Sequence, residues 1–125
     1  MPSTGKTFSV KTRRMTKTEA AWLAGLFDGE GSLIDSKRSG NQSGFCLRFQ
    51  ICMCNEEIIR RVQTIIGTGN ITYWKPKNPK HSESWRFHVH GMNAVHVLEQ
   101  IFPWLIVKRE LAEMWILQYI TVDPS

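Results

Sequence analysis

Two carboxylates stand at the end of an apolar segment: Asp28 and Glu30 close residues 23–31, which read LAGLFDGEG. Carboxylate and backbone carbonyl oxygens are the ligands that hard divalent cations such as Mg²⁺ prefer. Packing alone offers a second interpretation, in which residues 16–27 form a helix with a capping box, a glycine ends it and both acids are solvated. The segment is therefore either the end of an ordinary buried helix or part of a metal site.

Elements able to hold such a site follow from hydrophobic periodicity and from turn-forming residues. Alternation of apolar and polar residues predicts strands, and apolar stripes bounded by caps or proline predict helices. The expected elements are, in order, helix 16–27, strands 32–38 and 45–52, a helix capped by Asn55 and ended by Gly67, strands 71–74 and 84–90, and helices 92–102 and 107–120. This order predicts an α+β fold, in which helices cover one face of a four-stranded antiparallel sheet.

Size and charge narrow the class of protein. A chain of 125 residues fits one domain, predicted over residues 16–122 between a basic, flexible arm at 1–15 and a tail at 123–125. No apolar run approaches the roughly 20 residues that cross a bilayer, and residues 1–15 have no apolar stretch typical of a secretory signal.

The formal charge of +5 favours an anionic partner. Three cysteines, an odd number, indicate reduced thiols. We expect a soluble intracellular protein without a membrane or small-molecule partner.

The run LAGLFDGEG resembles the LAGLIDADG motif of a family of DNA-cleaving homing endonucleases, with Phe27 for Ile, Gly29 for Ala and Glu30 for the final Asp. The expected element order also matches the αββαββα order of that domain, whose sheet is saddle-like, so the resemblance spans residues 16–120. It implies an intron-encoded, site-specific double-strand DNA endonuclease that leaves short 3′ overhangs, in the cytoplasm of a bacterium or phage host or in a chloroplast or mitochondrion.

The resemblance assigns metal binding to the end of the motif. In the family the last acid holds the metal with help from the preceding carbonyl, which implies Glu30 and the carbonyl of Gly29. Mg²⁺ is the expected cofactor, Mn²⁺ is expected to substitute, and Ca²⁺ is expected to bind without supporting cleavage. We expect Gly29 and Gly31 to let the chain turn out of the helix. Asp28 is interpreted as a structural acid satisfied by nearby backbone donors or water.

Two further catalytic positions follow from the resemblance. The family has a basic residue shortly before the last helix, and Lys108 matches that position. It would act as an electrostatic stabiliser or would polarise the attacking water. Alternatively, it is only a solvated basic residue near the start of the helix. The family's polar, water-positioning residue at the end of the second strand is matched by Met53, which cannot orient water. Gln50 or Asn55 is left as a substitute.

A polar sheet face can lie along the DNA major groove, where each base pair presents a distinct set of donors and acceptors. Reading alternate strand residues predicts DNA contacts from Ser32, Ile34, Ser36, Arg38, Arg48, Gln50, Thr72, Trp74, Arg86, His88 and His90. Adjoining loops add Asn41, Gln42, Lys75, Lys77 and Lys80, and the arm adds Lys11, Arg13 and Arg14. Arginine and glutamine read guanine and adenine through paired hydrogen bonds, whereas lysines suit phosphates. Each polar residue could instead be the solvated side of the sheet.

A single motif supplies one set of metal ligands, whereas cutting both strands needs two. We therefore expect a homodimer on a long near-palindromic duplex, each half-site spanning roughly 10 base pairs. The helices would pair through Trp22, Leu23, Ala24, Gly25, Phe27 and Asp28.

Competing interpretations remain at this stage. The same domain also occurs in intron-splicing maturases and in catalytically inactive DNA-binding proteins. Cys52, Cys54, His88 and His90 could form a zinc site, although the cysteine spacing is not the usual one. An inert basic α+β domain is the remaining alternative.

Overall fold

The computed structural model describes residues 11–35, 46–78 and 80–122. Their elements, in chain order, are α1 (Lys17–Glu30), β1 (Gly31–Asp35), β2 (Leu47–Met53), α2 (Glu56–Ile66), β3 (Asn70–Trp74), β4 (Ser84–His90), α3 (Gly91–Ile101), a 3₁₀ turn η1 (Phe102–Trp104) and α4 (Arg109–Val122). No helix within these ranges is both long and apolar enough to cross a membrane. The predicted order of helices and strands is confirmed.

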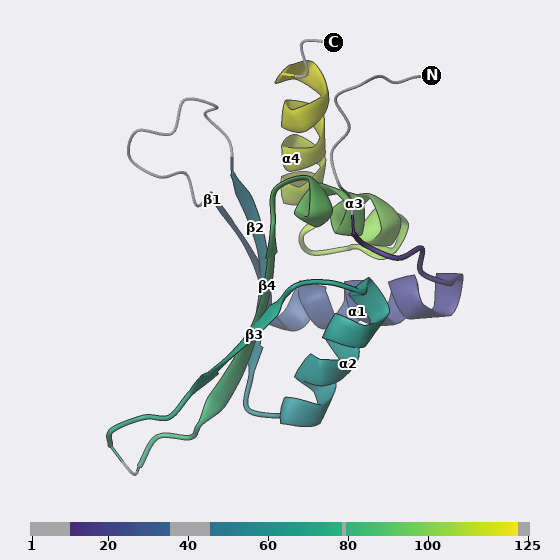
Figure 1. Ribbon diagram of the computed structural model, residues 1–125. Helices are drawn as coiled ribbons and strands as arrows, with labels where there is room; N and C mark the ends of the chain where they lie inside the picture. The colour runs from purple at the N-terminus through teal and green to yellow at the C-terminus, as the bar shows by residue number, and fades with distance from the viewer. Residues whose placement is uncertain (1–10, 36–45, 79, 123–125) are drawn as a thin grey trace.

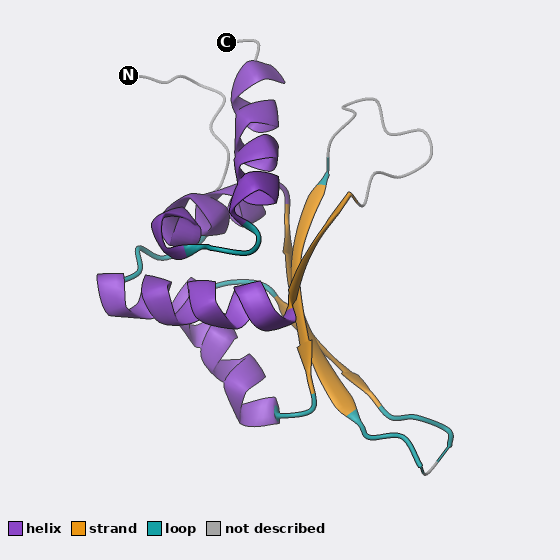
Figure 2. Cartoon of the chain, turned by 180° about the vertical axis from the view of Figure 1, so that it is seen from behind, coloured by secondary structure: helices purple, strands orange, loops and turns teal. Residues whose placement is uncertain are grey.

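The strands form one antiparallel sheet in the order β1-β2-β4-β3. The helices lie on one side of this twisted sheet, and its other side faces away from them (Figure 1, Figure 2). At one end of the sheet, β3 and β4 extend past the helices toward the loop that carries Lys75, Lys77 and Lys80 (Figure 1). The predicted α+β fold, with one covered and one open sheet face, is therefore confirmed.

Alternate strand residues point into the core between the sheet and the helices. The buried strand residues are Leu47, Phe49, Ile51, Phe87 and Val89. Phe27 of α1 stacks on Phe49 of β2, with ring centroids 4.2 Å apart and planes 8° from parallel. Large rings meeting in this way fix how α1 crosses the sheet, because well-packed aromatic pairs bury much apolar area in one geometry.

The start of α1 is capped as predicted. The N–H of Glu19 donates to Thr16 Oγ1 at 3.1 Å, and the N–H of Thr16 donates to Glu19 Oε1 at 3.0 Å. Together they satisfy two backbone donors that a helix start leaves unpaired.

The end of α1 differs from the prediction. The helix continues through Gly29 and Glu30, and Gly31 is its cap in an extended conformation, with φ of −96°. Gly29 is therefore helical, and the expectation that it lets the chain turn out of the helix is wrong. Because β1 begins at Gly31, the last helical turn leads straight into the sheet.

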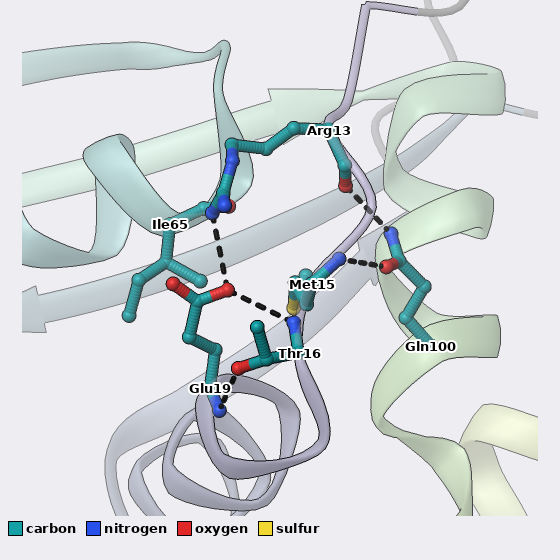
Figure 3. A network of polar contacts seen from close by, with 6 residues as sticks. All are labelled: Arg13, Met15, Thr16, Glu19, Ile65 and Gln100. Atoms are coloured by element: carbon teal, nitrogen blue, oxygen red, sulfur yellow. Dashed lines mark hydrogen bonds and ion pairs between the residues drawn. The ribbon is translucent and has the colours of Figure 1, made fainter.

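Residues 11–15, predicted to belong to a flexible arm, pack against the domain (Figure 3). Gln100 of α3 accepts a hydrogen bond from the N–H of Met15 at 2.7 Å and donates one to the carbonyl of Arg13 at 3.2 Å. Arg13 also donates to the Ile65 carbonyl at 2.8 Å and pairs with Glu19 at 3.2 Å. These contacts hold residues 11–15 against the domain, whereas residues 1–10 and 123–125 lie outside the described ranges.

Gly31→Ala is expected to lower the free energy of unfolding by about 1–3 kcal/mol, the usual cost of overfilling a packed core. A Cβ at position 31 would overlap the ring of Phe27, which is fully buried. Urea denaturation followed by circular dichroism measures the change. Gly29→Ala is the matched control, since a Cβ there would meet none of the described residues within 4 Å. Equal losses in the two variants would contradict this account of Gly31.

Candidate functional site

Asp28 ties the end of α1 to the loop that precedes α4. Its carboxylate accepts hydrogen bonds from the N–H groups of Ile106 at 2.7 Å and Lys108 at 2.9 Å. Burial alone would raise the pKa of Asp28, but hydrogen bonds from the backbone of residues 106–108 outweigh it and hold the pKa below its usual value. The prediction that Asp28 is a structural acid is confirmed, and its partners identify the segment that it holds.

Lys108 lies beside the motif although 80 residues separate it from Asp28. Its ammonium donates to the Asp28 carbonyl at 2.8 Å and lies 5.6 Å from the centre of the Phe27 ring. Half-buried and anchored in this way, the ammonium is fixed at the carboxyl end of α1 rather than free in solvent. The structure thus brings the predicted basic residue to the motif, and α4 starts one residue later, at Arg109.

Glu30 is the last residue of α1 and is exposed. Within the described ranges its carboxylate has no hydrogen bond or ion pair, in contrast to the fully engaged carboxylate of Asp28. The adjacent Gly29 is also exposed and lies in the final helical turn, where carbonyls lack intrahelical partners. Glu30 and the Gly29 carbonyl together offer hard oxygen donors that the fold leaves available.

The structure separates the three candidates for positioning water. Met53 faces the helices and packs against the core. Asn55 caps α2, its side-chain oxygen accepting from the N–H of Ile58 at 3.0 Å, so it already has a structural task. Gln50 lies on the open sheet face, directly opposite Ser32 of β1, the second residue after Glu30. Gln50 is therefore the better placed of the two substitutes.

Strand register determines which residues share the open face of the sheet, because directly opposed residues of antiparallel strands project from the same face. One row crosses all four strands, joining Ser32 to Gln50, Gln50 to His88 and His88 to Asn70. The full face carries Ser32, Ile34, Arg48, Gln50, Cys52, Asn70, Thr72, Trp74, Ser84, Arg86, His88 and His90. The shared face predicted from alternation is confirmed for every described member.

Asn70 also lies on this face, although the strand was predicted to begin at Ile71. The alternation of Asn70, Thr72 and Trp74 was the signal that could have found it. The predicted contacts Ser36, Arg38, Asn41 and Gln42 lie outside the described residues.

The open face and its adjoining loop are strongly basic. Lysines 75, 77 and 80 are exposed at the end of the sheet formed by β3 and β4. On the central strands, Arg48 and Arg86 flank His88, whose ring lies 5.1 Å from that of His90. Burial, followed by the charges of Arg48, His90 and Arg86, lowers the pKa of His88. An anionic ligand on this face would meet cations along the length of the sheet.

The exposed side of α1 differs from the set of residues that was predicted to pair two chains. Leu23, Ala24 and Phe27 are 0 % exposed within a single chain, so they are unavailable to a second one, and Asp28 is occupied by the loop before α4. The exposed side of α1 instead presents a different set, namely Thr18, Trp22, Gly25 and Gly29, with Ala21 and Leu26 half-buried. Of the predicted residues, Trp22 and Gly25 lie on this side.

The suggested zinc ligands are spread over different surroundings. Cys52 opposes Arg86 in the sheet, and Cys54 is exposed beyond the end of β2. In the part of the chain that the structure describes, no group of three or more His, Cys, Asp or Glu side chains could hold a metal ion. A metal bound at Glu30 would therefore depend on backbone oxygens, water, phosphate or a second chain for its remaining ligands.

Asp28→Ala is expected to destabilise the chain by on the order of 2 kcal/mol, since two backbone donors lose a charged acceptor. Because the folded-state pKa of Asp28 is lowered, its stabilisation is present above the unfolded pKa, about 3.9, and disappears as pH falls through the folded-state value. Urea denaturation between about pH 7 and pH 3 measures this. If Asp28→Ala lowered the free energy of unfolding equally at about pH 7 and about pH 3, the stabilising role assigned to the Asp28 carboxylate would be contradicted.

No protein-family model matches the sequence, and no curated protein is a match. Solved structures do match. The homing endonuclease I-CvuI, in complex with its target and in the presence of Ca, aligns over 86 % of this chain and 69 % of its own, with 21 % identity and a TM-score of 0.67.

Two other solved structures agree with this match. The archaeal intron-encoded I-Vdi141I complexed with DNA aligns over 78 % of this chain and 64 % of its own, with 20 % identity and a TM-score of 0.61. The group I intron-encoded I-CeuI complexed with DNA aligns over 89 % and 59 %, with 17 % identity and a TM-score of 0.60. The chain therefore has the fold of these homing endonucleases.

Proposed function

We propose that this protein is a site-specific endonuclease that hydrolyses both strands of duplex DNA. The observation that carries the proposal is the contrast at the end of α1. There the carboxylate of Asp28 accepts two backbone hydrogen bonds, whereas the carboxylate of Glu30 has no partner among the described residues. The free carboxylate stands where α1 enters the sheet, beside a basic open face long enough to follow a groove. The similar solved structures I-CvuI, I-Vdi141I and I-CeuI are complexes with DNA.

The donors around Glu30 fit a hard divalent cation. Carboxylate and carbonyl oxygens suit Mg²⁺, which keeps several water or phosphate ligands of its own. Glu30 and the Gly29 carbonyl would hold the ion, which when bound would lower the pKa of water and stabilise charge on the phosphate. I-CvuI has been solved with DNA in the presence of Ca and of Mg. We assign Mg²⁺ as the cofactor, with Mn²⁺ able to replace it and Ca²⁺ supporting binding alone.

The side chains near Glu30 have separate tasks in this proposal. Lys108 holds a positive charge beside the reacting phosphate, because its ammonium is fixed at the Asp28 carbonyl. Gln50 can hydrogen-bond a water molecule from the open face of the sheet. The basic side chains of the sheet and the lysines of the β3–β4 loop bind the duplex and align its backbone with Glu30.

A homodimer supplies the second half of the site. Each chain has one available acid at α1, and the exposed side of that helix is flat at Gly25 and Gly29, where added Cβ atoms would meet no described residue within 4 Å. Pairing of two such faces about a two-fold axis would place both Glu30 residues near the centre of the duplex. The target would then be near-palindromic, with half-sites of roughly 10 base pairs.

The test is cleavage of duplex DNA by the purified protein. A plasmid library with a randomised region of about 20 base pairs is incubated with the protein in Mg²⁺, and cut molecules are captured and sequenced. Enrichment of one near-palindromic sequence with short 3′ overhangs supports the proposal. Tight, salt-dependent binding without cutting, in Mg²⁺ or Mn²⁺, would contradict nuclease activity and indicate a DNA-binding protein of the same fold.

A further inference from the structure

Arg48 and His88 lie next to each other at the centre of the open sheet face. Arg48 is on β2 opposite His90, and His88 is two residues before His90 on β4, on the same face. Both strands are internal in the sheet order, so neither residue lies at an edge. None of the described helices covers this face, yet both side chains are half-buried by their neighbours.

Each of these side chains has a polar atom that the free chain leaves unsatisfied. Among the described residues, Arg48 Nε and His88 Nδ1 are inaccessible to solvent and have no hydrogen-bond partner. Buried polar groups in folded proteins are nearly always paired, so two neighbouring exceptions call for a reason. A ligand that supplies acceptors, and toward which both side chains can turn, would remove this cost on binding.

The surroundings of His88 favour its neutral form. The groups that face it are Arg48, Gln50 and Cys52 on β2, Arg86 and His90 on β4, and Asn70 and Thr72 on β3. Among the described residues, three basic side chains and no carboxylate shift the pKa of His88. An imidazolium at this position would be repelled by its neighbours and would gain no compensating ion pair from them.

We propose that Arg48 and His88 act as one DNA-contacting unit, and that His88 takes up a proton when duplex DNA binds. The inference rests on the proposed DNA-binding function and adds a linked proton to it. Phosphates and guanine edges supply acceptors and negative potential, which offset the charges of Arg48 and Arg86 and favour the imidazolium. Protonated His88 then donates from both ring nitrogens, which neutral His88 cannot do.

The sign of the pH effect follows from this linkage. The pKa of His88 is below its usual value in the free chain and would be higher in the complex. Affinity for DNA should therefore rise as pH falls through the pKa in the complex, and should stop rising below the pKa of the free chain. One linked proton changes the dissociation constant by up to about tenfold per pH unit within that window.

Fluorescence anisotropy with a labelled duplex of about 20 base pairs, without divalent metal, tests the proposal between about pH 8 and pH 6. The wild-type chain should bind at least about threefold more tightly at the lower pH, and His88→Gln should lose that gain. His96→Gln is the matched control, because His96 lies on α3, on the covered side of the sheet, and its loss should change nothing. Circular dichroism confirms that both variants fold.

Calorimetry in two buffers with different heats of ionisation counts the protons directly. Uptake by the wild-type chain that is absent from His88→Gln supports the proposal. If protons are taken up with a cognate duplex but not with an unrelated one, the group that accepts from His88 is a base edge. If uptake is equal with both duplexes, that group is a phosphate. DNA binding without proton uptake, or with uptake that persists in His88→Gln, overturns the inference while leaving DNA binding intact. No duplex binding at any pH overturns the proposed function as well.

Discussion

Glu30→Gln is expected to lower the rate of DNA cleavage by on the order of 1000-fold or more, the scale associated with loss of a principal charge-stabilising group. The amide has the size of the carboxylate but carries no charge, so it binds Mg²⁺ poorly. Glu30 has no structural partner among the described residues, so the free energy of unfolding should change little. Single-turnover cleavage of a cognate duplex measures the effect.

The binding measurement separates a catalytic from a structural role. Glu30→Gln should bind the same duplex in Ca²⁺ within a few-fold of the wild-type affinity, because the basic sheet face is unchanged. Glu113→Gln removes an exposed carboxylate from α4, and its cleavage rate should equal that of the wild-type chain. Retention of cleavage by Glu30→Gln would overturn the assignment of this acid, and equal losses in both variants would indicate a nonspecific effect of charge.

Much of the fold was predictable because its determinants are local. The capping box at Thr16, the cap at Asn55 and the alternation along β2 and β4 each need only a few neighbouring residues. The shared polar face follows from the same alternation, since a strand with one buried face has only one register that buries its apolar residues. Element type and the composition of the open face could thus be predicted from sequence.

Contacts between distant segments could not be predicted in the same way. Asp28 was predicted to be a structural acid, but its hydrogen-bond donors could not be named, because Ile106 and Lys108 lie about 80 positions further along the chain. Docking of residues 11–15 likewise depends on Gln100, which no local pattern connects with them. These contacts depend on how the helices cross the sheet, which the periodicity of each helix alone does not specify.

Three of the α1 residues predicted to pair two chains are buried in the structure, which the sequence could not reveal for a related reason. The helix is apolar around most of its circumference, so the sequence does not reveal which apolar side meets the sheet. Leu23, Ala24 and Phe27 face inward, where Phe27 stacks on Phe49. Ala24 and Gly25 were both predicted to pair the helices, although Ala24 is fully buried and Gly25 is exposed. Only the packed structure distinguishes them.

Gly25→Leu is expected to weaken chain pairing by on the order of 100-fold, because a bulky side chain between two closely packed helices costs about 3 kcal/mol. In the part of the chain that the structure describes, the added Cβ would meet nothing within 4 Å, so the monomer should be as stable as before, or more stable by up to about 1 kcal/mol from improved helix propensity. Analytical ultracentrifugation measures pairing, and urea denaturation measures stability.

The effect of Gly25→Leu on DNA cleavage distinguishes a homodimer from an enzyme that acts as a single chain. Two half-sites are needed to cut both strands, so Gly25→Leu should lose double-strand cleavage at concentrations where the wild-type chain is paired, and should recover part of it as concentration rises. Thr64→Leu places the same side chain on the exposed face of α2 and should leave pairing and cleavage unchanged. If Gly25→Leu remained paired and cut both strands normally, α1 would not be the interface, and the second Glu30 would have to reach the duplex through another surface.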